Sequence, residues 1–167
     1  MAALFAASTK WLERGITVLE QILLCCLVVV MFSLTLAQVI FRYLLDSPLV
    51  WSEELVRYLL VWTSMIGAAG ALRLGSHFSL ITFVAHLRPR AAAAVMLVVD
   101  LAVGIFAAVV LIQGVRMTMF GFSEQAVSFS VSMGWFYLAV PVGGGLMLWH
   151  VAARTIGNWA DKASLRG

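Results

Sequence analysis

The side chains that could carry metal or redox chemistry are few, and their spacing speaks against both kinds of site. Cys25 and Cys26 are adjacent within an apolar run, so they cannot form an ordinary disulfide with each other and no Cys-x-x-Cys spacing exists. His77, His86 and His150 do not fall at the ligand spacings of a zinc site. We therefore expect no metal, no cofactor and no catalytic centre, and a protein that is not an enzyme.

A second group of reactive side chains lies in "WSEELVRYLLVWTSMIGAAGALRLGSH", residues 51–77, where three charges stand at the start of an apolar stretch. In a helix, Arg57 follows Glu53 by four residues and Glu54 by three, so either carboxylate can reach its guanidinium group. Local neutralisation explains how these charges survive near lipid, but leucines would serve a lipid-facing helix better. The three charges therefore predict a contact with something other than lipid.

The same helical face continues as a stripe of small residues, which suits close contact between helices; the stripe comprises Ser64, Gly67, Ala68 and Ala71. We predict that this face, with Glu53 or Glu54 and Arg57 at one end, is buried against other helices and helps dock a partner. Trp51 is expected at headgroup level as an interfacial anchor. An ion pair that simply sits beside the lipid headgroups remains the alternative.

Composition identifies the setting in which these residues must be placed. Hydrophobic residues make up 63% of the 167 residues, charged residues make up 11%, and mean hydropathy is +1.02. Soluble domains are roughly a quarter charged, so the chain is predicted to be an all-α integral membrane protein. One four-helix domain accounts for the length, with spans near residues 22–41, 49–72, 91–115 and 133–153 and tails at 1–21 and 154–167.

Basic residues predict the orientation of these spans. Eight of the eleven Lys and Arg residues lie before the first span, between the second and third, or after the fourth: Lys10, Arg14, Arg73, Arg88, Arg90, Arg154, Lys162 and Arg166. By the positive-inside rule both termini and the middle loop are cytoplasmic. The net charge of +3 follows from this topology and does not indicate a nucleic-acid partner.

The middle loop itself is too apolar to be a solvated connection. "HFSLITFVAHLRPR", residues 77–90, places polar and apolar side chains on opposite helical faces, which is typical of a short amphipathic helix in the membrane interface. The alternative is that this segment simply extends a neighbouring span.

Asp100 is a carboxylate within the third span, where insertion costs at least ~2.5 kcal/mol. It shares a stripe with small residues that suit helix packing, namely Ala93, Gly104, Ala107 and Gly114. We predict that Asp100 is buried in the bundle, hydrogen-bonded or protonated, and binds no substrate. A proton or ion relay remains the alternative.

The fourth span contains Pro141, which removes a backbone donor and is expected to kink the helix. The glycines that follow, residues 143–145, leave a smooth surface centred on Gly144. This surface is either a contact for a partner subunit or only a local deformation of the span.

Residues 38–77, "QVIFRYLLDSPLVWSEELVRYLLVWTSMIGAAGALRLGSH", resemble the signature region of the small membrane subunit of TRAP (tripartite ATP-independent periplasmic) transporters. The matching positions are Arg42, Tyr43, Trp51, Glu53, Glu54, Leu55, Arg57, Trp62, Gly67, Arg73, Gly75 and His77. The segment "MGWFYLAVPVGGGLML" resembles the last span of that family, with Trp135, Tyr137, Pro141 and Gly143 in place. One departure is that "FSLITF" lacks the acidic residue that commonly follows the histidine.

The resemblance implies a function that composition does not give. Such subunits lie in the bacterial inner membrane beside a large elevator-type membrane subunit and work with a periplasmic substrate-binding protein in sodium-driven uptake of organic acids. The small subunit is expected to brace the large one, in keeping with the lack of paired interrupted spans in this chain. A stand-alone homo-oligomeric transporter and a haem-binding membrane protein are the alternatives.

Overall fold

The computed structural model describes residues 2–75, 89–128 and 130–164, which are almost wholly helical. The long helices are α1 (Ala2–Leu44), α2 (Val50–Gly75), α4 (Pro89–Gly121) and α6 (Ala139–Ser164), and α5 (Gly134–Tyr137) is a single turn before α6. Within these described residues, four segments are long and apolar enough to cross a membrane, namely Glu13–Leu44, Val50–Arg73, Ala94–Gly121 and Gly134–Thr155. The predicted all-helical fold with four long apolar helices is confirmed.

The helices extend past the predicted spans at most of their ends. Much of the expected N-terminal tail, from residue 2 onward, is the beginning of α1, and α4 continues to Gly121 rather than ending near residue 115. The amphipathic helix predicted between the second and third spans falls on residues 77–90, nearly all of which lie outside the described part of the chain.

A tight turn joins α1 to α2. Asp46 has a φ of 47°, in the left-handed region that Asp tolerates better than most residues. The Ser47 amide donates to the Phe41 carbonyl at 3.2 Å, which closes the end of α1. Pro48 follows and cannot continue a helix from that point. The two helices therefore run antiparallel, side by side.

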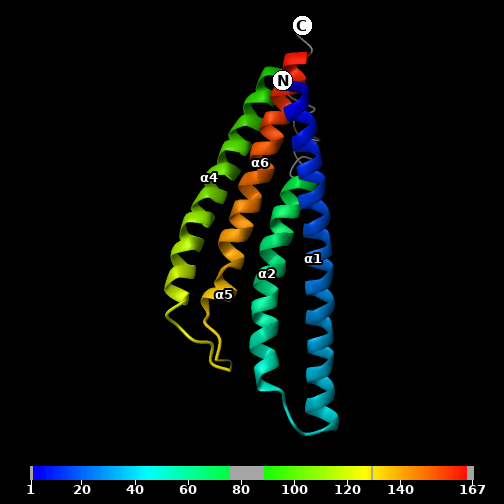
Figure 1. The fold of residues 1–167 in the computed structure, drawn as a ribbon, viewed down its shortest axis with the longest axis vertical. Helices are drawn as coiled ribbons and strands as arrows, with labels where there is room; N and C mark the ends of the chain where they lie inside the picture. The colour runs from blue at the N-terminus through cyan, green and yellow to red at the C-terminus, as the bar shows by residue number, and fades with distance from the viewer. Residues whose placement is uncertain (1, 76–88, 129, 165–167) are drawn as a thin grey trace.

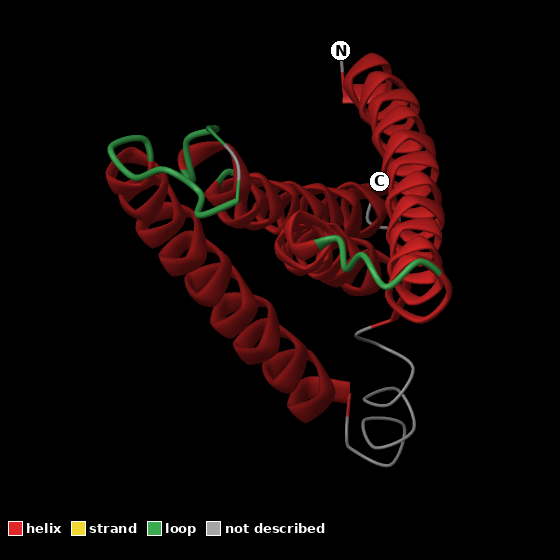
Figure 2. Cartoon of the chain, turned by 90° about the horizontal axis from the view of Figure 1, so that it is seen from below, coloured by secondary structure: helices red, strands yellow, loops and turns green. Residues whose placement is uncertain are grey.

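The long helices form a row in the order α4, α6, α2, α1 (Figure 1). α6 packs against α4 on one side and α2 on the other, while α1 packs mainly on α2 and touches α6 over a smaller area. Seen from below, the helices do not close around a common axis (Figure 2). α6 is therefore the helix that holds the row together.

The core of the row is built from small residues and a few larger apolar ones. Ile66, Ala69 and Ala107 are fully buried and Met147 nearly so. Large apolar side chains are widespread on the outer faces of the helices, as expected for surfaces in contact with lipid or another membrane protein.

Candidate functional site

The two adjacent glutamates at the start of α2 have different partners. Glu53 lies 3.7 Å from Arg57, and both side chains are about two-thirds exposed, at 68% and 70%. Glu54 makes no contact of this kind with Arg57; its Oε1 accepts a hydrogen bond from the Tyr58 hydroxyl at 2.7 Å. The expected ion pair is therefore formed by Glu53.

Glu54 instead binds the loop between α4 and α5. Its Oε1 accepts from the Val127 amide at 3.2 Å and its Oε2 accepts from the Ser128 amide at 2.8 Å. Hydrogen bonds to a carboxylate are stronger than those between neutral groups. Sequence reasoning missed this contact because Glu54 and the two amides are more than 70 residues apart.

The loop that Glu54 holds is a short hairpin. Gln125 and Ser132 form an antiparallel bridge, and the Ala126 amide donates to the Val131 carbonyl at 3.0 Å. Val127, near its tip, is 91% exposed. On α2, Tyr58 stacks on Phe136 of α5 with ring centroids 3.9 Å apart, which adds an apolar contact beside the polar one.

Two further candidates, Arg42 and Trp51, lie at this end of the molecule on the surface of the chain. Trp51 is 40% exposed and Arg42 is exposed near the end of α1. His77 lies outside the described residues. The structure thus brings Glu53 and Arg57 together, while Arg42 and Trp51 lie on the surface of the chain.

The small-residue stripe of α2 is divided between two neighbours. Gly67 faces α1, because a Cβ built on it would lie 3.9 Å from Leu24 Cδ2. Ala68 and Ala71 line an apolar groove of about 630 Å³, while Ser64 is exposed. Only part of the predicted stripe is therefore a helix contact within this chain.

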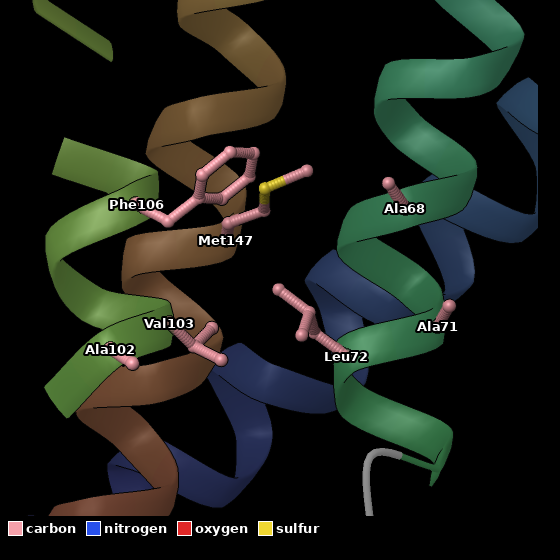
Figure 3. A pocket seen from close by; sticks show the side chains of 7 residues that line it. All are labelled: Ala68, Ala71, Leu72, Ala102, Val103, Phe106 and Met147. Atoms are coloured by element: carbon pink, nitrogen blue, oxygen red, sulfur yellow. The ribbon is translucent and has the colours of Figure 1, made fainter. Parts of the chain in front are cut away.

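The apolar groove lies over α6, between α2 and α4 (Figure 3). Its lining residues are Ala68, Ala71 and Leu72 of α2, Ala102, Val103 and Phe106 of α4, and Met147 of α6. Almost all of this lining is apolar, and the groove is open on one side. It therefore offers shape and apolar surface but no group for binding a charged substrate.

Asp100 forms an ion pair with Arg154 of α6, and both side chains are about four-fifths buried. Its predicted stripe forms part of the α4–α6 contact: Ala107 is fully buried, and a Cβ on Gly114 would lie 2.7 Å from Pro141 N. Asp100 is therefore held in the α4–α6 contact by a charge on α6, and its role as a purely structural residue stays a prediction.

Pro141 is followed by the three glycines, and their environments differ. α5 ends and α6 begins on either side of Leu138, three residues before Pro141, and the kink expected from Pro141 stays a prediction. Of the two interpretations left open for these glycines, a partner contact at Gly144 does not fit the structure, because a Cβ there would lie 2.8 Å from Leu111 N of α4. Gly143 faces Met65 of α2 at 2.7 Å, and only Gly145 has open space around it.

A further buried contact was not predicted. Glu20 Oε1 of α1 and His150 Nε2 of α6 lie 2.8 Å apart, and both side chains are about 95% buried. The sequence signal that could have indicated this contact is Glu20 itself, a carboxylate near the start of an otherwise apolar span. Histidine here serves a contact between helices, and the described residues contain no cluster of three or more His, Cys, Asp or Glu side chains that could hold a metal ion.

These features define a class of protein. The described residues contain four helices that are long and apolar enough to cross a membrane, so the chain is a multi-pass helical membrane protein. Within it Glu20, Glu54 and Asp100 each bind another helix or a loop. The family model "Tripartite ATP-independent periplasmic transporters, DctQ component" matches residues 31–161. The chain belongs to this family, whose members are transporter components and not enzymes.

Two curated relatives are similar to the chain. One is the sialic acid TRAP transporter small permease protein SiaQ of Vibrio cholerae, 26% identical over 141 residues that cover 84% of this chain and 82% of that protein. The other is the sialic acid TRAP transporter permease protein SiaT of Haemophilus influenzae, 37% identical over 76 residues. That match covers 46% of this chain but only 12% of SiaT, so a segment like this one is part of a much longer permease.

Proposed function

We propose that this small permease subunit braces a large elevator-type membrane subunit in a sodium-driven transporter for organic acids. The large subunit carries the substrate, and a periplasmic binding protein delivers it. The match to a short segment of the longer SiaT permease supports a physical association of this kind, because a segment similar to this chain is covalently part of a longer permease there. Sialic acid, named in both relatives, is the first organic acid to test.

The same proposal includes the location and orientation of the chain. It lies in the bacterial inner membrane with both termini and the loop between α2 and α4 in the cytoplasm, as the distribution of Lys and Arg supports. The hairpin held by Glu54 then lies on the periplasmic side, as does the Glu53–Arg57 pair.

The main support for a docking surface on this chain is the exposed Glu53–Arg57 ion pair. An ion pair open to solvent contributes only ~0–1 kcal/mol, and an ion pair facing lipid is unfavourable. The pair is on the outer face of α2 in line with Ser64 and Ala71, which are also exposed. We infer that the large subunit covers this face, so that both charges become buried and paired.

Co-purification and uptake test this proposal. Arg57→Leu and Glu53→Leu should each reduce recovery of the large subunit roughly tenfold or more and lower organic-acid uptake in parallel, because each strands a charge at a buried interface. The double variant should be less damaging than either single variant. Arg116→Leu is the matched control, since Arg116 is an exposed arginine on α4 and should tolerate the change.

Normal assembly and uptake in both single variants would contradict the docking surface. Uptake by this chain in the absence of any large subunit would instead support a stand-alone homo-oligomeric transporter. Sodium coupling is tested separately, by measuring uptake in proteoliposomes with the sodium gradient present or collapsed.

A further inference from the structure

Two buried polar groups on neighbouring helices have complementary character. Oε2 of Glu20 on α1 and Nε of Arg73 on α2 are both buried, and neither has a hydrogen-bond partner among the described residues. A carboxylate oxygen is an acceptor, whereas the guanidinium Nε is a donor and always carries part of a positive charge. The glutamate oxygen therefore lacks a donor, the arginine N–H lacks an acceptor, and each is the type of group that the other lacks.

The register of α1 on α2 brings the two groups to the same level. Gly67 of α2 faces Leu24 of α1 at 3.9 Å, and the two helices run in opposite directions (Figure 1). One helical turn from this contact, α1 reaches Glu20 while α2 reaches Ala71, two residues before Arg73. Glu20 and Arg73 therefore differ by only about 3 Å along the bundle.

The face of α2 also directs Arg73 inward. Ile66, Ala69 and Arg73 follow the i, i+3, i+7 spacing of one helix face, and the first two side chains are fully buried. Glu20 meets His150 in the contact between α1 and α6, and both of these helices pack on α2. Arg73 thus lies on the side of α2 that faces the interior of the chain.

Charge balance gives the physical reason for a pairing. Asp100 and Arg154 neutralise each other one turn along α6 from His150. The described partner of Glu20 is an imidazole, which is a cation only when it is protonated, and a buried carboxylate without a permanent compensating cation is strongly unfavourable. We propose that Arg73 compensates Glu20, so that Arg73, Glu20 and His150 form one network joining α2, α1 and α6. The inference concerns the folding of this chain alone and does not rest on the transport function.

A double-mutant cycle on the full chain in lipid nanodiscs tests the network. Glu20→Gln and Arg73→Gln should each lower the melting temperature by roughly 6–20 °C, because each leaves one buried charge without its partner. The melting temperature of the double variant should fall by clearly less than the sum of the decreases in the two single variants. The exchanged pair, Glu20→Arg with Arg73→Glu, should recover part of the loss seen in either reversal alone.

The control is Arg116→Gln on α4. Arg116 is exposed, so its substitution should leave the melting temperature nearly unchanged and add simply to Glu20→Gln. If Arg73→Gln does not accumulate as folded protein, Arg73→Lys and Arg73→Met replace it, and Lys should be markedly more stable than Met. Additive losses in the Glu20–Arg73 cycle, or equal losses for Lys and Met, would overturn the proposal.

Discussion

At the scale of single residues, Glu53 and Glu54 show how adjacent carboxylates acquire different tasks. Successive residues on a helix point about 100° apart, so Glu53 is on the outer face beside Arg57 while Glu54 is directed toward the hairpin. One carboxylate is available for a partner and the other is used within the chain. The Tyr58 hydroxyl orients the second by a hydrogen bond one turn further along α2.

Glu54→Ala should loosen the hairpin without unfolding the helices. The change removes the acceptor of the Val127 and Ser128 amides, and a hydrogen bond to a charged group is worth about 1.5–3 kcal/mol. We expect these two amides to exchange with solvent deuterium at least roughly tenfold faster. Glu53→Ala is the matched control and should leave their exchange unchanged; equal exchange in Glu54→Ala and the unsubstituted chain would rule out this role.

At the scale of elements, α6 can pack closely against two helices because it presents a glycine, which has no side chain, to each of them. Gly143 lets α2 approach, and Gly144 lets α4 approach. Pro141 packs on Gly114 of α4, where a side chain would leave no room for the proline ring. One turn apart at the other end, His150 and Arg154 bind carboxylates from α1 and α4. α6 therefore combines close backbone contact with two polar links.

Gly144→Leu should destabilise this chain itself rather than a contact with a partner. Its Cβ would lie 2.8 Å from Leu111 N and 3.0 Å from Leu111 Cα, both backbone atoms that can move only with α4. We expect a loss of roughly 1–3 kcal/mol or more, measured as a lower melting temperature in detergent. Gly145→Leu is the control, because nothing lies within 4 Å of a Cβ built at this position. Its melting temperature should remain near that of the unsubstituted chain. Equal stability of the two variants would contradict this packing.

At the scale of the whole molecule, the row of helices leaves two broad faces with little burial inside the chain. Large apolar side chains are exposed along α1, α2 and α4, and the groove over α6 is apolar as well. A bilayer satisfies such surfaces, and so does a second membrane protein. An open row of this kind is a suitable shape for a subunit that lies along the side of a larger one.

The proposed orientation can be measured by cysteine accessibility in intact cells. In a background of Cys25→Ser and Cys26→Ser, Val127→Cys should react with a membrane-impermeant maleimide added from the periplasmic side, since this position is 91% exposed on the hairpin. Arg14→Cys, an exposed position near the opposite end of the row, should react only after the inner membrane is opened. The reverse labelling pattern would invert the topology.

The sequence by itself determined the helical class, the number of long apolar helices and the family, because these depend on residues close together in the chain. Runs of apolar residues, the Glu53–Arg57 spacing and the motif from residue 38 to 77 are all local signals. The stripe around Asp100 also predicted a packing surface, since helical periodicity alone places Gly104, Ala107 and Gly114 on one face.

Only the tertiary structure decided which of these residues meet. Glu54 with the Val127 and Ser128 amides, and Glu20 with His150, are contacts between positions more than 70 residues apart. The spacing of residues along the chain cannot reveal these contacts, because the face that a helix turns toward one neighbour also depends on how it packs against its other neighbours. For the same reason Gly144 and Gly145, adjacent and identical in type, differ completely: one touches the backbone of α4 and the other has free space around it.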